Sequence, residues 1–378
     1  MEALRPRVVA EVNLDAIKHN YKQIRNHVPH EVEIMAIVKA DAYGHGAVEV
    51  SKLLQEEGVN RFAVAIAKEG EELRSQGITS PILILGYTPR ADIKTLIENN
   101  LTQTVFSYEM AKTLSDEAGK LGKTINIHIK VDTGMGRIGF LSSPQSVEEV
   151  KMISQLPHLN MEGIFTHFST ADEEDIAYTR KQWHIFEGFL QELRGVGIEL
   201  PVIHAANSAA IMCHSYTDLN VVRPGIILYG YYPSEYLKGK MIDIIPAMTL
   251  KTQVVHIKEL PERHYIGYGR TYYTHQKTKV ATIPVGYADG YSRRLGNVGK
   301  VLIRGQYAPI IGNICMDQFM VDVTNIDDVT VEDEVVLFGK QGENEISVEE
   351  IAAQLGTINY EIICMIGKRV PRIYVKTK

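Results

Sequence analysis

The sequence predicts an α/β protein, a (β/α)8 TIM-type barrel followed by a C-terminal, mostly-β domain. Eight short apolar runs alternate with segments of helical periodicity between Val32 and about Tyr229. Beyond Met241 the helical segments give way to strand-like runs that are broken by Gly, Asn and Asp. Eight parallel strands joined by helices are what a closed barrel requires. The 378 residues, of which 45% are hydrophobic and 23% charged, suffice for two domains with cores of their own.

The eight apolar runs are the predicted barrel strands. They lie at residues 32–38, 62–66, 82–85, 102–106, 125–131, 161–165, 202–205 and 220–222. The segments between them carry apolar residues at helical spacing, for example Phe186, Phe189 and Leu193 before the seventh run. An earlier run, residues 8–12, precedes a helix-like segment, and its strand could belong to the second domain. We therefore expect a barrel domain at residues 1–240.

The predicted second domain covers residues 241–378. Its strand-like runs lie at residues 248–257, 280–285, 300–303, 310–314, 320–323 and 335–338. One helix is expected at residues 347–355, because Ser347 is a suitable N-cap and Glu350 follows three residues later, the spacing of a capping box.

Composition narrows the classes of function. The formal net charge is -6 and the basic residues are scattered among acidic ones, so we expect no nucleic-acid partner. No apolar stretch is long enough to span a membrane and the N-terminus lacks a signal-peptide core, so we expect a cytoplasmic protein. The three cysteines are far apart and show no paired spacing, so we expect neither a disulfide framework nor a bound metal.

Lys39 is the first candidate for chemistry. It follows the first predicted barrel strand and opens the polar turn at residues 40–46, at the end of the strand where α/β barrels keep their active sites. Burial lowers the pKa of a lysine and makes its amine available for Schiff-base formation with an aldehyde. Taken alone, a lysine that extends from a strand edge into solvent is the simpler interpretation.

The fifth predicted strand has one apolar and one polar face. Asn126, His128, Lys130 and Asp132 alternate with branched apolar residues, so the polar face must point into the barrel. A glycine-rich loop that carries Arg137 follows, although a simple βα turn would explain it equally well.

Further polar residues follow other predicted strands at the same end of the barrel. They are His167, Asn207, Ser208 and Arg223. Arg223 begins the sequence Arg-Pro-Gly-Ile, whose backbone amides join Ser208 at strands seven and eight, the usual phosphate site of such barrels. A lysine at strand one combined with a phosphate site favours pyridoxal 5'-phosphate (PLP) as the cofactor.

These motifs resemble those of the alanine racemase family, in order and over essentially the whole chain. The matching segments are AIVKADAYGHG (36–46), VDTGMGR (131–137), THF (166–168), ANS (206–208), RPGI (223–226), GYGRT (267–271), VGYADG (285–290) and ICMD (314–317). The resemblance implies a PLP-dependent isomerase that interconverts L- and D-alanine and supplies D-alanine for peptidoglycan. It also implies a head-to-tail homodimer in which the β domain of one subunit closes the barrel of the other.

The resemblance implies two catalytic acid/base groups. Lys39 would bind PLP and act on one face of the substrate, and Tyr268 of the partner would act on the opposite face. Racemisation removes the Cα proton from one face and returns a proton to the other, so two groups serve it. Since a phenol ordinarily has a pKa of about 10, His167 and Arg223 would be needed to make Tyr268 an effective base.

The other implied roles concern binding. Arg223 would face the pyridine nitrogen and keep it unprotonated. The phosphate would be held by Tyr43, Ser208 with its neighbour Asn207, the amides of Gly225 and Ile226, and Tyr360. Arg137 would contact the phenolic oxygen of PLP beside the substrate, and Tyr287 and the Met316 amide would bind the substrate carboxylate. Lys130 would be carbamylated, or would remain an ordinary lysine bonded to Asp132 or water.

Other functions remain open from sequence alone. A broad-specificity or serine racemase differs from an alanine racemase only in pocket shape. A PLP-binding carrier would lack the second domain, and a decarboxylase on the same barrel would favour a carboxylate where Arg223 stands.

Overall fold

The computed structural model describes residues 6–376 and divides the chain into two compact units. One unit, here called the barrel unit, is Ala16–Pro246; the other, the β unit, joins Met1–Asp15 to Ala247–Lys378. The two units meet in the sequence between Pro246 and Ala247, six residues beyond the predicted end of the barrel domain.

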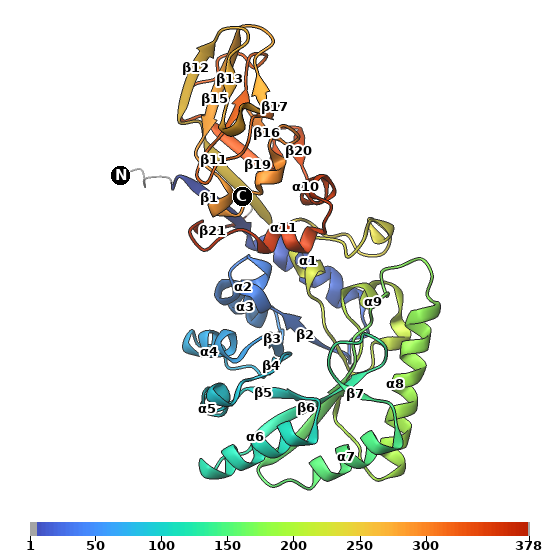
Figure 1. Ribbon diagram of the computed structural model, residues 1–378. Helices are drawn as coiled ribbons and strands as arrows, with labels where there is room; N and C mark the ends of the chain where they lie inside the picture. Colours follow the sequence, from blue (N-terminus) through green and yellow to red (C-terminus); the bar gives the residue numbers. More distant parts are fainter. Residues whose placement is uncertain (1–5, 377–378) are drawn as a thin grey trace. The chain divides into compact units, whose positions relative to one another are not determined.

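The barrel unit is a closed ring of eight parallel strands, as the sequence predicts (Figure 1). The strands are β2 (Glu33–Ile37), β3 (Arg61–Val64), β4 (Ile82–Ile84), β5 (Thr102–Val105), β6 (Ile125–Asp132), β8 (Leu159–Phe165), β9 (Val202–His204) and β10 (Val221–Val222). Each strand pairs with its neighbours in this order, β10 pairs with β2, and β5 pairs with β6 to complete the ring. The short strand β7 (Phe140–Leu141) adds to β6.

The helices of this unit lie outside the strand ring (Figure 1). They are α1 (Leu14–His27), α3 (Ala47–Glu56), α4 (Ala67–Ser75), α5 (Ile93–Glu98), α6 (Tyr108–Lys120), α7 (Pro144–Ser154), α8 (Ala177–Gly195) and α9 (Ser208–Cys213). The short segment labelled α2 (Lys39–Tyr43) is a left-handed turn. Helix α8 buries Phe186, Phe189 and Leu193 as its apolar spacing predicts. Strand β6 places His128 and Lys130 in the interior, so the barrel core is partly polar.

The β unit is built on a sheet of ten strands. They are β1 (Val8–Asn13), β11 (Met248–Gln253), β12 (His256–Leu260), β15 (Thr278–Ile283), β16 (Lys300–Ile303), β17 (Gln306–Ile311), β18 (Phe319–Asp322), β19 (Glu334–Gln341), β20 (Asn344–Ile346) and β21 (Arg372–Val375). Strand β1 lies between β11 and β21, so the N-terminal run 8–12 joins the second domain. A separate hairpin pairs β13 (Tyr265–Ile266) with β14 (Tyr272–Tyr273).

One predicted strand of this unit is wrong. The run at residues 248–257 is two strands, because β11 pairs with β1 and β19 whereas β12 pairs with β15. The helix expected at 347–355 is present as α10 (Val348–Leu355), and Ser347 accepts a hydrogen bond from the Glu350 N–H at 3.0 Å. A second helix, α11 (Asn359–Cys364), follows it.

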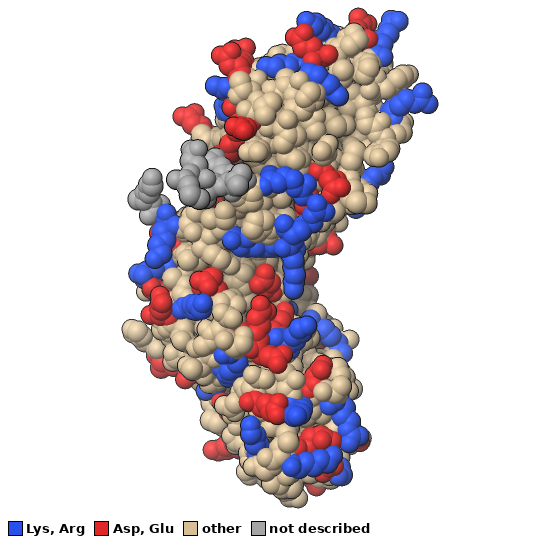
Figure 2. Space-filling view, turned by 90° about the vertical axis from the view of Figure 1, so that its left-hand side faces the viewer, with Lys and Arg blue, Asp and Glu red and all other residues tan. Residues whose placement is uncertain are grey.

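The surface agrees with the charge pattern of the sequence. Figure 2 shows positive and negative side chains over the whole of the face that it draws. Within residues 6–376, no helix combines the length and the apolar character that crossing a membrane demands.

Candidate active site

Lys39 stands directly after β2, at the carboxyl end of the strand, and is half-buried. The turn that follows it is left-handed. Ala40, Asp41, Ala42 and Tyr43 have φ values of 52° to 54°. Each non-glycine residue in this conformation costs about 1–2 kcal/mol relative to the right-handed helix, so surrounding contacts must stabilise the turn.

Two carboxylates provide those contacts. Glu69, at the start of α4, accepts hydrogen bonds from the N–H groups of Ala40 at 2.7 Å and Ala65 at 2.7 Å. Asp41 accepts one from Ala47 N–H at 2.8 Å. The strained turn is therefore fastened to the next two helices of the barrel, and Lys39 is fixed at its start.

Arg223 follows β10 and is buried in the barrel. Its guanidinium donates to the carbonyls of Thr166 at 2.8 Å and Ala205 at 2.9 Å, and it contacts His167 Nδ1 at 3.4 Å. Burial, and then the charge of Arg137, lowers the pKa of Arg223 to about 9, so the side chain remains a cation at neutral pH. Burial, followed by the positive charges of Arg223, Arg137, Lys130 and Lys39, lowers the pKa of His167 well below its ordinary value. His167 is therefore a neutral imidazole with two arginines and two lysines around it.

A chain of hydrogen bonds runs from Arg223 into the barrel. Arg223 can only donate, so His204 Nδ1, 3.0 Å from Nη1, accepts. His204 Nε2 must then donate to His128 Nδ1 at 2.8 Å, and the other nitrogen of His128 faces Glu162 Oε2 at 3.8 Å. Burial is the main cause that lowers the pKa of both histidines, which are neutral. We call His204, His128 and Glu162 the barrel relay.

Lys130 is the second lysine of the site and is 2% exposed. Its Nζ donates to Val131 O at 2.6 Å. Burial, and then the positive charge of Arg223, lowers the pKa of Lys130 to about 7. Asp132 has its Oδ1 engaged by the N–H groups of Gly134 at 2.9 Å and Gly136 at 3.1 Å, so its carboxylate shapes the loop that carries Arg137.

The predicted phosphate ligands of the barrel unit lie together. Ser208 Oγ accepts a hydrogen bond from Gly225 N–H at 2.9 Å. A Cβ at Gly225 would lie 2.7 Å from the Tyr43 hydroxyl, so any larger residue here would require the Tyr43 side chain to shift. Asn207 caps α9 by accepting from Ala210 N–H, which fixes the neighbouring Ser208. Hydroxyls and backbone amides beside the cations around His167 suit a phosphate-bearing cofactor such as PLP.

The remaining predicted site residues belong to the β unit. Tyr268, at the tip of the β13–β14 hairpin, is 73% exposed, and its carbonyl accepts from Asn313 Nδ2 at 2.8 Å. Tyr287 and Met316 are also exposed, and Tyr287 N–H donates to Cys315 O at 3.2 Å. The loop at residues 312–317 thus connects the backbones that carry all three.

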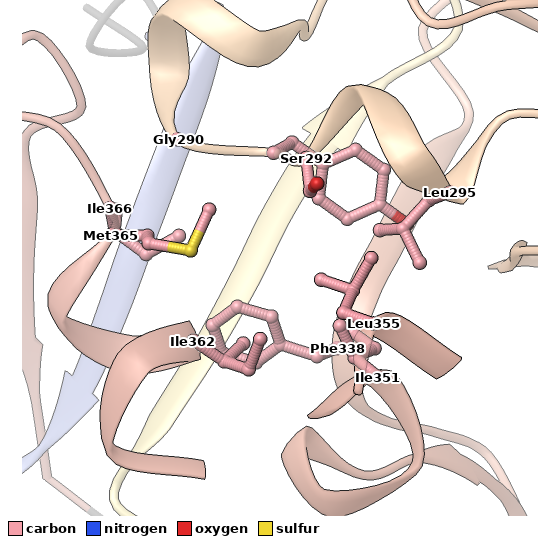
Figure 3. A pocket seen from close by; sticks show the side chains of 10 residues that line it. Gly290, Ser292, Leu295, Phe338, Ile351, Leu355, Ile362, Met365 and Ile366 are labelled. Atoms are coloured by element: carbon pink, nitrogen blue, oxygen red, sulfur yellow. The ribbon is translucent and has the colours of Figure 1, made fainter. Parts of the chain in front are cut away.

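Tyr360 lies on α11, whose Ile362 lines an apolar cavity together with α10 and the loop that begins at Gly290 (Figure 3). The same apolar packing therefore supports the helix of Tyr360 and the segment that follows Tyr287. Within residues 6–376, no group of three or more His, Cys, Asp or Glu side chains is arranged to hold a metal ion.

Comparison with known proteins decides the family. Residues 12–233 match the model of the alanine racemase N-terminal domain, and residues 247–374 match that of the alanine racemase C-terminal domain. The chain belongs to the alanine racemase family. This confirms the resemblance and the predicted fold class, and it makes the chain an isomerase, an amino-acid racemase.

Individual members of the alanine racemase family are similar over nearly their whole length. The alanine racemase of Clostridium perfringens strain SM101 is 53% identical over 373 residues, which cover 99% of this chain and 96% of that protein. The solved structure of alanine racemase from Clostridium difficile 630 superposes with a TM-score of 0.96 at 45% identity, covering 99% and 97% of the two chains. A histidine racemase from Leuconostoc mesenteroides subsp. sake superposes with a TM-score of 0.90 at 31% identity, covering 99% of each chain.

Several residues of this alanine racemase family site are not evident from the sequence. Glu69 and the relay residues His204 and Glu162 were not singled out, because each acts through another residue. The alternating polar face of β6 was the one available signal, since it placed His128 inside the barrel.

Proposed function

We propose that the protein interconverts L- and D-alanine with PLP as its cofactor. The observation that carries the proposal is the arrangement around His167. A neutral imidazole, two arginines and two lysines stand at the carboxyl end of the barrel strands, together with a cradle of hydroxyl and amide groups. The membership of both domains in the alanine racemase family supports it.

In this proposal Lys39 holds PLP, and Tyr43, Ser208, Gly225, Ile226 and Tyr360 bind its phosphate. Arg223 donates to the pyridine nitrogen and Arg137 to the phenolic oxygen. The chemistry that bound PLP supplies is electron withdrawal, which makes the Cα proton of an amino acid acidic. Because Arg223 remains a cation at neutral pH, it would keep the pyridine nitrogen of bound PLP unprotonated.

The protein moves protons at two atoms. Lys39 Nζ exchanges a proton with one face of Cα, and Tyr268 Oη exchanges a proton with the other face. His167 is neutral, and its Nδ1 lies 3.4 Å from Arg223 Nη2. Tyr287 and the Met316 amide bind the substrate carboxylate.

We propose further that Tyr268 acts in the site of a partner subunit, in a homodimer. At 73% exposure, the Tyr268 side chain meets water rather than a substrate pocket. Tyr287 and Met316 are also exposed, at 42% and 53%. Covering these side chains with the barrel unit of a second copy would exclude water from the reaction.

Lys130 is proposed to be carbamylated. An amine with a pKa of about 7 is about half unprotonated at pH 7, and the neutral amine is the form that reacts with CO2. The nitrogen bonds to the carbon of CO2, one C–O π bond becomes a lone pair on oxygen, and the amine proton passes to water. The resulting anion would relieve the repulsion of Lys130 by Arg223 and Arg137.

The choice of alanine over another amino acid rests on family membership. A protein of the same fold is named a histidine racemase, after a different side chain, so a serine or broad-specificity racemase is the second candidate. A carrier is disfavoured by the β unit, and a decarboxylase by the cation Arg223. Supply of D-alanine for peptidoglycan and a cytoplasmic location are part of the proposal.

Incubation with L-alanine and added PLP in heavy water tests the proposal. Deuterium at Cα should appear together with D-alanine, because the returning proton comes from exchangeable groups. The same assay with L-serine and L-histidine measures specificity. A protein that binds PLP but forms neither deuterated alanine nor D-alanine would rule the alanine racemase activity out.

A further inference from the structure

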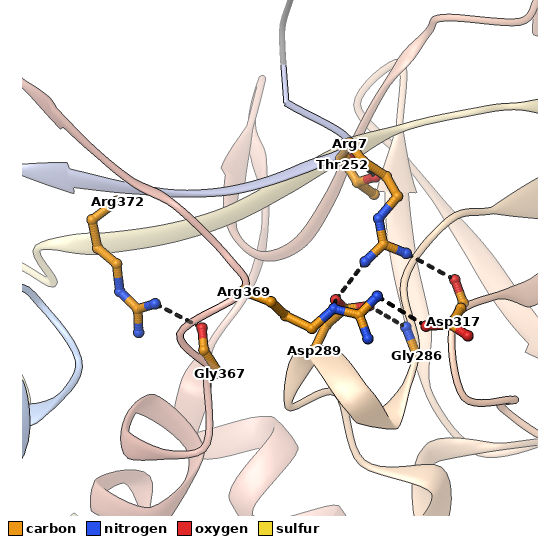
Figure 4. Close-up of polar contacts among 8 residues, drawn as sticks. All are labelled: Arg7, Thr252, Gly286, Asp289, Asp317, Gly367, Arg369 and Arg372. Carbon is orange, nitrogen blue, oxygen red and sulfur yellow. Dashed lines mark hydrogen bonds and ion pairs between the residues drawn. The ribbon is translucent and has the colours of Figure 1, made fainter.

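Asp289 is a buried carboxylate of the β unit, 1% exposed, that the proposed mechanism does not use. It follows Tyr287 by two residues, and its Oδ2 accepts from Gly286 N–H at 3.0 Å. Its Oδ1 receives two arginines, Arg7 Nη2 at 2.5 Å and Arg369 Nε at 3.1 Å (Figure 4). A buried charge is tolerated when it is paired and hydrogen-bonded in this way.

The same two arginines reach the residue after Met316. Arg7 Nη1 donates to Asp317 O at 3.2 Å, and Arg369 Nη2 donates to Asp317 Oδ1 at 2.9 Å (Figure 4). Each guanidinium therefore bridges the loop of Tyr287 and the loop of Met316. We call Arg7, Asp289, Asp317 and Arg369 the arginine clamp.

Backbone contacts leave the two loops little freedom to separate. Ala288 N–H donates to Met316 O at 3.1 Å. A Cβ at Gly286 would lie 2.2 Å from Met316 O, so the loops touch where no side chain fits. Gly367 N–H donates to Asp289 O at 3.0 Å, which ties the segment of Arg369 to the same point.

We infer that the arginine clamp is a positioning device for the substrate carboxylate. It fixes the position of the Tyr287 side chain relative to the Met316 backbone, so that both can bind the same carboxylate group. The inference rests on the proposed function, in which these two residues bind that group. The clamp residues touch each other and the loops, and they act on the substrate through Tyr287 and Met316.

The clamp should affect binding more than proton transfer. The substrate carboxylate carries the same charge before and during the reaction, so contacts to it stabilise the ground state and the transition state alike. Loss of such uniform binding raises KM and leaves kcat unchanged.

The test is the substitution Asp289→Asn, which keeps the shape of the side chain and removes its charge. We expect the KM for alanine and the inhibition constant of propionate to rise about tenfold, the scale of one charge-assisted hydrogen bond, with kcat within about twofold of wild type. Binding of ethylamine, which has an amine and no carboxylate, should not change. Asp333→Asn is the matched control, because Asp333 also accepts an N–H three residues earlier, from Thr330, and pairs with Arg304.

Unchanged KM and propionate inhibition in folded Asp289→Asn, or equal loss of propionate and ethylamine binding, would overturn the inference. If Asp289→Asn does not fold, Arg7→Gln is judged by the same readouts. That variant removes the bridge from a half-exposed arginine and leaves Asp289 paired with Arg369. Failure of the proposed function is distinguishable, since the wild-type protein would then form no D-alanine.

Discussion

Lys130 shows how burial changes what a lysine can do. The side chain has one carbonyl partner, lies 5.5 Å from the centre of the Phe165 ring, and is repelled by Arg223 and Arg137. Polar and apolar residues alternate along β6, and this pattern predicted that Lys130 lies inside the barrel. An ion pair between Lys130 and Asp132 was one of the predicted alternatives to carbamylation. The carboxylate of Asp132 instead accepts hydrogen bonds from the backbone N–H groups of the loop that follows it. The alternation of polar and apolar residues predicts the face of a strand, but not such a local hydrogen bond.

Stability should depend on pH through Lys130. Its pKa is about 7 in the folded state and 10.5 for an ordinary lysine. The unfolded chain therefore binds more protons between these values, and the free energy of unfolding should rise with pH across that window, by a few kcal/mol. Thermal unfolding of the PLP-free protein in CO2-free buffer should show this rise, and Lys130→Met should lack it.

Exposed Lys94 provides the control, because Lys94→Met should retain the full pH dependence. If the stability of wild type and of Lys130→Met depended on pH in the same way, the pKa assigned to Lys130 would be contradicted. Added bicarbonate should flatten the wild-type curve if Lys130 is carbamylated, since a carbamate does not titrate as an amine.

The turn after Lys39 marks the limit of residue-level prediction. Gly44 and Gly46 indicated a turn in the sequence, but Ala40 to Tyr43 have no intrinsic preference for positive φ. The conformation depends on Glu69, a residue of another helix, and a sequence without its fold does not reveal that contact.

Among the elements, β6, β8 and β9 share the barrel relay. Strand β6 supplies His128, β8 supplies Glu162 and β9 supplies His204, so parallel pairing brings them together. Arg61 of β3 donates to Glu162 at 2.8 Å. Contacts with His128 and Arg61 lower the pKa of Glu162 to about 2 although burial opposes them, so Glu162 is an anion 3.8 Å beyond His128, where the hydrogen-bond chain from Arg223 ends.

Glu162→Gln should reduce the acid sensitivity of the fold. With a folded pKa of about 2 against 4.5 for an ordinary glutamate, ionised Glu162 stabilises the protein above pH 4.5, and this contribution is lost as the pH falls from 4.5 towards 2. The variant should lose about 3 kcal/mol at pH 7 and show a flatter dependence at low pH. Denaturant unfolding from pH 7 to pH 3 measures both effects.

Glu98→Gln is the control, because Glu98 is an exposed partner of Lys94 at 3.7 Å. That substitution should change stability by less than about 0.5 kcal/mol. If the free energy of unfolding falls equally below pH 4.5 in Glu162→Gln and in wild type, the folded state does not stabilise the ionised carboxylate of Glu162.

At the level of elements the sequence was a good guide. All eight barrel strands were predicted, because parallel strands buried on both faces are short apolar runs bounded by turns. The β unit was harder: residues 248–257 contain neither glycine nor proline, so nothing marks the point where the chain leaves β11 and begins β12. Which partners each half pairs with is a long-range property.

In the whole molecule, the proposed site is divided between the two units. Lys39, Lys130, His167 and Arg223 belong to the barrel unit, whereas Tyr268, Tyr287, Met316 and Tyr360 belong to the β unit. The sequence motifs identified both groups, but a single sequence cannot show which chain supplies each group. In the proposed head-to-tail dimer the β unit of each subunit closes the barrel of the other, which would bury the exposed tyrosines of both subunits.

Mixing two inactive variants tests the shared two-base site most directly. Lys39→Ala and Tyr268→Phe should each be inactive alone. After joint unfolding and refolding at equal amounts, half of the dimers should be mixed, and each should hold one intact site, restoring about a quarter of wild-type racemase activity. A refolded mixture that exchanges subunits and remains inactive would contradict the account, because Lys39 and Tyr268 would then have to come from the same chain.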